Sequence, residues 1–240
     1  MANPRVAVFR PDDDRIRRAE GLLSSLGADP VLDPMLAVEP TDATPGTAPH
    51  VVFTSKTGAE LVADAGWEPA GAVHAIGPKT ADALRAAGYT VRVVPDKYSS
   101  TGLVRALRDK VAGECVEVAR SDHGSPVLLD GLRDASADVT ETVLYRLARP
   151  PRAGDSTERA AHGDLDGACF TSSLTVEHFL AAAAERGVRD EAVAGLAAGV
   201  VGAIGEPTAE TARDRGLSVE VVPDEATFAT LAQAVVERGE

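Results

Sequence analysis

The chain has 240 residues, of which 44% are hydrophobic, and a formal net charge of −13. This is enough apolar material for one large domain or two small ones, and the acidic surface argues against a nucleic-acid partner. No apolar run reaches the roughly 18 residues of a membrane span, and no apolar signal segment stands at the N-terminus. We therefore expect a cytoplasmic protein without a membrane partner. Cys115 and Cys169 lie in short apolar runs, which predicts two buried free thiols.

Short runs of β-forming residues alternate along the chain with segments of helical periodicity. In chain order, the predicted strands are residues 6–9, 51–53, 73–76, 91–94, 116–119, 139–144, 168–170, 200–204 and 219–222. Helical spacing is clearest in residues 80–87, 101–111, 174–185 and 227–236. Gly88 and Gly216 stand where a glycine that ends a helix is expected. This alternation favours parallel sheets that are covered by helices on both faces.

An internal repeat accounts for most of this pattern. The segment that begins at Ala75 recurs at Ala203 without a gap. The sequence VVFTS at 51–55 is echoed by ACFTS at 168–172, and a weaker echo places Arg10 and Arg120 at the ends of matching strands. Such a repeat predicts two similar domains of about 100 residues each.

Two proline-rich segments, residues 33–50 and 145–155, are expected to be linkers between the repeats. Each begins with residues that can form a strand, so the two segments could pair with each other. The repeat by itself favours a simple tandem of domains with a break near Gly113.

Hydroxyl and glycine residues gather where predicted strands give way to helices. They are Thr54, Ser55, Gly77, Thr80, Thr171, Ser172 and Thr208. In doubly wound sheets, ligands bind outside the carboxyl ends of strands, where helix N-termini offer free N–H groups to anions. The simpler interpretation is that Ser55, Thr80, Ser172 and Thr208 are helix N-caps, although one residue can do both.

Arg10 and Arg120 end matching strands, and arginine suits bidentate contact with a carboxylate. The alternative is a surface ion pair with the nearby Asp12 or Asp122. Lysine is scarce in this chain, yet Lys56 and Lys79 both lie in the turns of the first repeat copy. The five histidines share no spacing and are expected to be structural or surface residues.

The order and spacing of several motifs resemble those of the uroporphyrinogen-III synthase family. They are VVFTSKTG at 51–58, the Gly-x-x-Thr turn from Gly77 to Thr80, the Pro-acid-x-Tyr segment that ends at Tyr98, and ETVLYR at 141–146. DGACFTS at 166–172 and IGEPT at 204–208 are similar to second copies of these motifs. The second copy departs from the first because it has no counterpart of Tyr98.

The resemblance implies two similar doubly wound, flavodoxin-like parallel-sheet α/β domains, joined by a two-stranded β linker, with the substrate in a cleft between them. It implies a discontinuous first domain of residues 1–34 and 150–240. It further implies an inserted second domain of residues 40–143 and linker strands at residues 35–39 and 144–149. This interleaved arrangement differs from the tandem that the repeat alone favours.

The family's reaction closes linear hydroxymethylbilane into a ring with inversion of the last pyrrole through a spiro intermediate, and it needs no cofactor or metal. The resemblance implies a monomer in which Tyr145 is the acid for departure of the substrate hydroxyl. Packing between the linker strands is the alternative role for this residue. The expected substrate-binding residues are Arg10, Thr54, Ser55, Lys56, Gly77, Lys79, Thr80, Tyr98, Arg120, Thr171, Ser172 and Thr208. The basic turns of the first copy lead us to expect that the inserted domain is the better anion binder.

Two other classes of protein remain open on the sequence. A non-catalytic sensor of tetrapyrroles or small anions could use the same scaffold, because a fold does not fix an activity. A generic nucleotide-binding α/β protein is disfavoured, because the chain lacks the glycine-rich phosphate motifs of that class.

Overall fold

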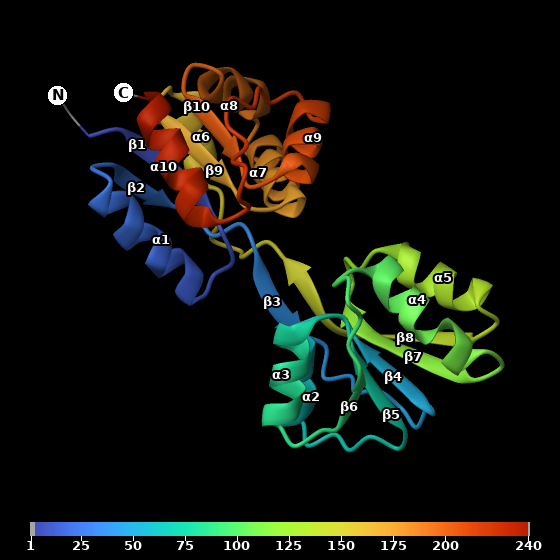
Figure 1. The fold of residues 1–240 in the computed structure, drawn as a ribbon. Coiled ribbons are helices and arrows are strands. Elements are labelled where there is room, and N and C mark those ends of the chain that lie inside the picture. The colour runs from blue at the N-terminus through green and yellow to red at the C-terminus, as the bar shows by residue number, and fades with distance from the viewer. Residues whose placement is uncertain (1–2, 240) are drawn as a thin grey trace. The chain divides into compact units, whose positions relative to one another are not determined.

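The structure is a computed structural model that describes residues 3–239, and the chain divides into two compact units. Unit 1 consists of Met1–Ala37 and Ala148–Glu240, and unit 2 consists of Val38–Leu147. In Figure 1 the blue N-terminal and the orange to red C-terminal segments belong to the same unit. No helix in the described part of the chain is both long and apolar enough to span a membrane.

Unit 1 is built on a four-stranded parallel sheet in the order β10-β9-β1-β2. Its strands are β1 (Arg5–Phe9), β2 (Asp29–Leu32), β9 (Gly167–Phe170) and β10 (Val200–Ala203). Its helices are α1 (Asp14–Ser25), α6 (Asp155–Ala161), α7 (Ser173–Glu185), α8 (Arg189–Leu196), α9 (Glu206–Asp214) and α10 (Phe228–Gly239). The alternation of β1 explains the layers: Ala7 and Phe9 pack with α6 to α9, whereas Val6 and Val8 pack with α1 and α10.

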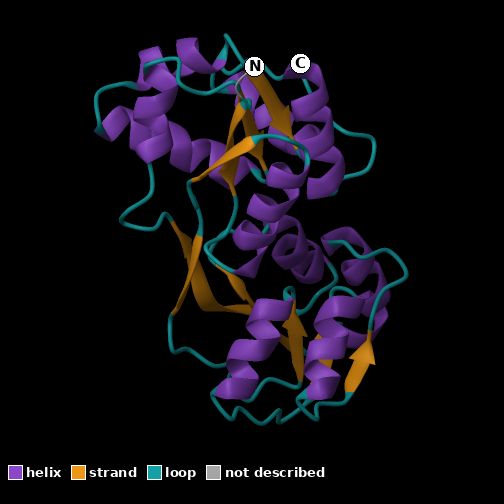
Figure 2. Ribbon diagram, turned by 90° about the vertical axis from the view of Figure 1, so that its left-hand side faces the viewer, coloured by secondary structure: helices purple, strands orange, loops and turns teal. Residues whose placement is uncertain are grey.

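Unit 2 contains a six-stranded sheet in the order β3-β8-β7-β4-β5-β6, and the pairs from β8 to β6 are parallel. Its strands are β3 (Ala37–Pro40), β4 (His50–Phe53), β5 (Ala72–Ala75), β6 (Val91–Val93), β7 (Cys115–Ser121) and β8 (Asp138–Ala148). Its helices are α2 (Lys56–Asp64), α3 (Pro78–Ala86), α4 (Ser100–Val111) and α5 (Pro126–Asp134). Val51 and Phe53 face α2 and α3, and Val52 faces α4 and α5. Figure 2 distinguishes these helices, in purple, from the orange strands.

The two sheets share one arrangement. The order β2-β1-β9-β10 in unit 1 matches β8-β7-β4-β5 in unit 2, and the pairs β5/β10, α3/α9 and α4/α10 follow the sequence repeat. Unit 2 begins with β4, the counterpart of the third strand of unit 1, so its chain order is circularly permuted. The strand order reverses between β1 and β9 and between β7 and β4, which is the switch point of a doubly wound sheet. The predicted flavodoxin-like α/β fold class is confirmed.

Two local predictions are wrong. Residues 219–222 form no full strand, because Val221 makes only an isolated bridge to Gly202. The Glu220 carboxylate accepts the Val201 N–H at 2.8 Å, which replaces a regular ladder bond. Cys115 is exposed because it is the first residue of β7 and precedes the buried part of the strand, whereas Cys169 is buried as expected.

Much of the first proline-rich segment is packed against unit 2 instead of running free. The Trp67 indole N–H donates to the Pro45 carbonyl at 2.8 Å, and the Gly46 N–H donates to a Glu117 carboxylate oxygen at 2.8 Å. Thr142 donates to the other oxygen of Glu117. These bonds attach the segment to the sheet, and β3 lies beside β8 at its edge.

Candidate functional site

A pocket of about 230 Å³ lies in unit 2 at the carboxyl ends of β4 and β7, the point where the strand order reverses. We call it the switch-point pocket. Its polar lining consists of Thr54, Ser55, Ser100, Arg120, Ser121, Ser125 and Tyr145. Carboxyl ends of strands at a switch point are where ligands bind in open α/β sheets. The structure thus brings together four of the residues singled out in the sequence: Thr54, Ser55, Arg120 and Tyr145.

Tyr145 reaches this pocket because β8 contains an irregularity. Arg120 pairs with Val143, but the next residue of β7, Ser121, pairs with Tyr145, so Leu144 is an extra residue in β8. As a result Leu144 and Tyr145 both pack into the core under α2, although neighbouring residues of a regular strand face opposite sides. Tyr145 is only 6% exposed.

The Tyr145 hydroxyl donates a hydrogen bond to Ser55 Oγ at 3.0 Å. Ser55 is also the N-cap of α2, as expected, and its Oγ accepts the Gly58 N–H at 3.0 Å. Gly58 leaves room for the pair, since a Cβ there would lie 3.0 Å from Leu144 and 3.1 Å from Ser55 Oγ. With both acceptor positions of Ser55 occupied, its own hydroxyl proton remains available to a ligand in the pocket.

Arg120 is buried in the wall of the same pocket, at 6% exposure. Its Nε donates to Glu141 Oε1 at 2.6 Å, and a terminal nitrogen donates to the Ser125 carbonyl at 2.6 Å. Gly124 permits this position, because a Cβ there would lie 2.5 Å from Arg120 Cδ. The alternative prediction, an ion pair between Arg120 and Asp122, is wrong. The acid that pairs with Arg120 is Glu141 on the neighbouring strand β8.

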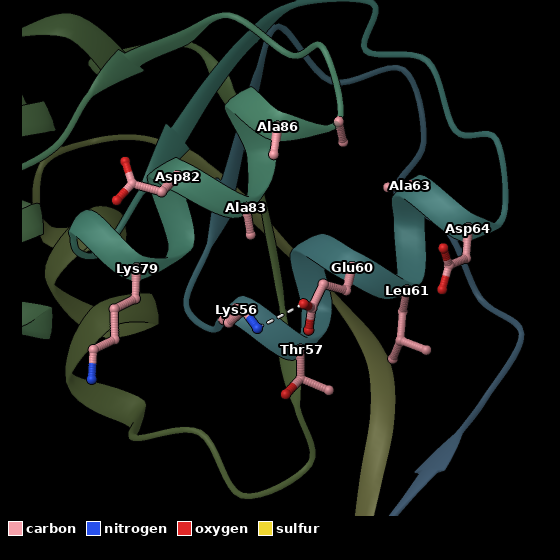
Figure 3. Close-up of a pocket in the computed structure, with 11 residues that line it drawn as sticks. Lys56, Thr57, Glu60, Leu61, Ala63, Asp64, Lys79, Asp82, Ala83 and Ala86 are labelled. Carbon is pink, nitrogen blue, oxygen red and sulfur yellow. Dashed lines mark ion pairs between the residues drawn. The ribbon is translucent and has the colours of Figure 1, made fainter. Parts of the chain in front are cut away.

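A larger groove of about 1180 Å³ lies between α2 and α3. Lys56 and Lys79 lie on its rim, and Figure 3 shows that their ammonium groups do not point toward one another. Lys56 Nζ forms an ion pair with Glu60 at 2.8 Å. Besides the two lysines, the lining consists mainly of four alanines and three acidic residues, Glu60, Asp64 and Asp82, which would repel an anion. The smaller switch-point pocket is therefore the better candidate site.

The Gly-x-x-Thr turns differ from the expectation. Gly77 and Gly205 are the N-caps of α3 and α9, and Thr80 and Thr208 stand three residues later, where they are buried. The interpretation of these threonines as N-caps is wrong because each helix begins earlier, with a proline in its first turn. Tyr98 is 65% exposed and lies over Gly77, where a Cβ would meet Tyr98 Cβ at 3.4 Å.

Unit 1 places a related set of residues at its own switch point. Ser172 caps α7 in a capping box with Thr175, and Thr171 Oγ1 donates to the Phe9 carbonyl at 2.7 Å. The Arg10 guanidinium carbon lies 4.6 Å from the centre of the Phe228 ring. Arg10 has no ion-pair partner among residues 3–239, so the expected alternative of a pair with Asp12 is wrong as well.

Sequence reasoning missed Glu141, Gly58 and Gly124, which hold or make room for the pocket side chains. ETVLYR contains Glu141, but only the register between β7 and β8 shows that it faces Arg120. Among residues 3–239, no cluster of three or more His, Cys, Asp or Glu is arranged to hold a metal ion.

Comparison with known proteins agrees with this architecture. Residues 17–233 match the family model of uroporphyrinogen-III synthase HemD. A protein of Methanothermobacter thermautotrophicus, provisionally named uroporphyrinogen-III synthase, is 31% identical over 201 residues, which cover 79% of this chain and 78% of that protein.

Two solved structures show the same fold over nearly the full chain. A mutant uroporphyrinogen III synthase from the thermophilic bacterium Thermus thermophilus has a TM-score of 0.68 at 20% identity and covers 98% of both chains. Uroporphyrinogen-III synthetase from Helicobacter pylori has a TM-score of 0.64 at 13% identity, with 98% of this chain and 99% of that one covered. With the match to the family model extending over most of its length, the chain belongs to the uroporphyrinogen-III synthase family.

Proposed function

We propose that this chain is a lyase that converts hydroxymethylbilane into uroporphyrinogen III, a step of tetrapyrrole biosynthesis. The observation that carries the proposal is the Tyr145 hydroxyl, held by Ser55 in a switch-point pocket of a chain from this family. The pocket volume is below the about 300–1,000 Å³ typical for drug-sized ligands. It therefore suits the reacting end of the substrate and not all four rings.

The reaction needs one proton donor at its first step. The substrate hydroxyl takes up a proton and leaves as water, and the remaining chain becomes an electrophilic azafulvene. The last ring attacks through its substituted carbon to give a spiro intermediate, which opens and recloses with that ring inverted. The ring carbon that closes the macrocycle then loses its proton, and this proton restores the donor. The net change is loss of one water with no transfer of electrons, so proton transfer and conformational control suffice.

Tyr145 is the donor in this proposal. A tyrosine hydroxyl normally keeps its proton at neutral pH and can therefore act as a general acid. In the structure this proton is directed to Ser55. When the phenol O–H turns toward the substrate hydroxyl, the Ser55 O–H can turn in the opposite sense and donate to the phenol oxygen. Ser55 would then stabilise the negative charge that develops on Tyr145 as the water departs.

Uncharged donors account for how an acidic protein can hold a polycarboxylate. The N-terminal turns of α2, α3, α7 and α9 each offer free N–H groups at the carboxyl end of a sheet. In this proposal the substrate-binding residues of these turns are Thr54, Ser55, Lys56, Gly77, Lys79, Thr80, Thr171, Ser172 and Thr208. Tyr98, which lies over Gly77, offers a further hydroxyl.

The proposal is tested by incubating the purified chain with hydroxymethylbilane, oxidising the products and separating the type I and type III porphyrins. We expect type III, whereas the substrate alone closes to type I. Tight binding of the substrate with only type I product would contradict the proposal and would be the behaviour of a non-catalytic sensor.

A further inference from the structure

The two arginines at the switch points occupy equivalent positions in the two units. Arg10 stands two residues after Val8 of β1, and Arg120 stands two residues after Val118 of β7. Residues two apart in a strand lie on the same face, which places Arg120 on the face of Val118. Arg10 directly follows β1, and its guanidinium lies over Phe228, which packs in the same core cluster as Val8. The difference between the two arginines must therefore come from their neighbours.

The neighbouring strand supplies that difference. Val8 pairs with Leu32 on β2, and Val118 pairs with Glu141 on β8. Glu141 reaches along its strand to Arg120 and accepts its Nε–H at 2.6 Å. At the matching position unit 1 has the apolar Leu32, which packs beside the core of α1 and α10.

The helix that covers this face also begins with a different residue in each unit. Phe228 begins α10 in unit 1, and Ser100 begins the matching helix α4 in unit 2. The guanidinium of Arg10 lies over the Phe228 ring, a contact that attracts a cation but does not neutralise its charge. Arg10 Nε is buried and has no hydrogen-bond partner among residues 3–239. Nitrogen donors in this state are rare in folded proteins, which points to a missing acceptor.

The other charged groups near Arg10 do not provide that acceptor. Asp13 is bound to Arg15, with 2.8 Å between one carboxylate oxygen and the Arg15 Nε. Burial lowers the pKa of Arg10 below its ordinary value, and the charges of Arg15 and Arg18 lower it further, whereas the charge of Asp13 opposes the shift without reversing it. Burial raises the pKa of the Cys169 thiol to about 12, so this sulfur is neutral and cannot serve as the counter-ion.

We propose that Arg10 binds one carboxylate of the substrate, and that the switch point of unit 1, rather than that of unit 2, supplies the arginine that binds an anion. In unit 2 the carboxylate of Glu141 already accepts the Arg120 Nε–H that a ligand carboxylate would otherwise accept. This reverses the sequence expectation, based on Lys56 and Lys79, that the inserted domain is the better anion binder. The identity of the carboxylate as a substrate group rests on the proposed function, but the anion site itself does not.

The site can be tested with acetate as a probe, at low ionic strength because salt screens such contacts. The side-chain Nε–H resonances of ¹⁵N-labelled protein are followed during the titration, and the Arg10 signal is identified by its loss in Arg10→Lys. We expect the Arg10 resonance to move and saturate while the Arg120 resonance stays in place. An Arg10 resonance that does not respond, or an Arg120 resonance that responds equally, overturns the inference without any further variant.

A reciprocal exchange sharpens the test. Leu32→Glu gives unit 1 the acid that unit 2 has, and acetate should then bind Arg10 at least tenfold more weakly. Glu141→Gln removes the internal carboxylate, and the Arg120 resonance should begin to respond. Unchanged acetate affinity at Arg10 in a folded Leu32→Glu protein contradicts the inference, and the wild-type titration decides it if that variant does not fold.

The failure of this inference is distinct from failure of the proposed function. A chain that makes the type III ring but shows no acetate response at Arg10 refutes only the anion site. A chain that binds acetate at Arg10 but yields only the type I ring refutes only the proposed reaction.

Discussion

The hydroxyl of Tyr145 lies 3.0 Å from Ser55 Oγ, although the two residues are 90 positions apart in the chain. The irregularity of β8 at Leu144 turns the tyrosine toward α2, and the N-cap of α2 holds the serine. Neither residue reaches its position through local sequence alone. A hydroxyl pair fixed by two separate backbone features is pre-organised, which is what transfer of a proton to a bound substrate requires.

Ser55→Ala should reduce both stability and turnover. Loss of an N-cap costs about 1 kcal/mol, so the free energy of unfolding should fall by about that amount. Turnover should fall as well, because Tyr145 loses its partner. Ser99→Ala is the matched control, since Ser99 caps α4 through the Gly102 N–H at 3.1 Å and does not line the pocket. Urea denaturation and initial rates should show similar destabilisation in both variants and loss of activity only in Ser55→Ala. Equal rates would restrict Ser55 to capping.

Gly124→Ala should displace Arg120 from the pocket wall. The added Cβ would lie 2.5 Å from Arg120 Cδ, so the guanidinium must leave Glu141 or the loop between β7 and α5 must move. Forcing an atom into a packed site typically costs about 1–3 kcal/mol. Gly21→Ala in α1 is the control. Beyond its own helix backbone, no atom of residues 3–239 would lie within 4 Å of the added Cβ, and an alanine in a helix should raise the free energy of unfolding by up to about 1 kcal/mol. The urea midpoint should fall in Gly124→Ala and rise in Gly21→Ala. An unchanged midpoint in Gly124→Ala would contradict this packing.

Acid should destabilise unit 2 through His74. This side chain is 2% exposed, and burial, with the charges of His50 and Lys110, lowers its pKa from 6.5 to about 4. The unfolded chain therefore binds a proton more readily between these values. The part of the free energy of unfolding that depends on His74 is therefore at its maximum above about pH 6.5, and it falls progressively as the pH falls to about 4.

The shift corresponds to a loss of about 3 kcal/mol at most, at 1.36 kcal/mol per pH unit. His74→Leu removes the titrating group, so its unfolding free energy should fall less between pH 7 and pH 4.5 than that of the wild type. Other groups also titrate in this range, and only the difference between the two proteins is diagnostic. Parallel curves would show that His74 does not contribute.

The strands, helices and repeated halves could be predicted from the sequence because they depend on local periodicity. The matching turns at Gly77 and Gly205 also follow from the repeat. Residues 219–222 have the composition of a strand. The Glu220 carboxylate accepts the Val201 N–H, however, and the segment makes only an isolated bridge to β10. The interleaved division into domains came only from the resemblance, since the repeat alone favoured a tandem of domains.

The candidate site was predictable only in part. Ser55 and Arg120 could be named because each stands at the end of a predicted strand, and Tyr145 was named from the resemblance. Their partners could not, since the contact of Arg120 with Glu141 depends on the register of two parallel strands. The difference between Arg10 and Arg120 has the same origin, because the neighbouring strand carries Leu32 in unit 1 and Glu141 in unit 2. The scarcity of lysine, on which the prediction of the better anion-binding domain was based, contains no information about these neighbours.

We propose that the Tyr145 hydroxyl assists departure of the substrate hydroxyl. Tyr145→Phe keeps the ring and removes the proton donor. Tyr89→Phe is its matched control, because the Tyr89 hydroxyl donates to the Trp67 carbonyl at 2.6 Å and does not line the pocket. Both variants lose one hydrogen bond, so their stabilities should fall by similar, modest amounts.

The most direct measurement is the rate of type III formation from hydroxymethylbilane by the wild type and these two variants, with the type I product recorded in the same samples. General-acid assistance is typically worth about 10²–10⁴-fold. The rate for Tyr145→Phe should fall by about that factor while type I accumulates, and Tyr89→Phe should retain the wild-type ratio of isomers. A Tyr145→Phe protein that forms the type III ring at the wild-type rate would contradict the account.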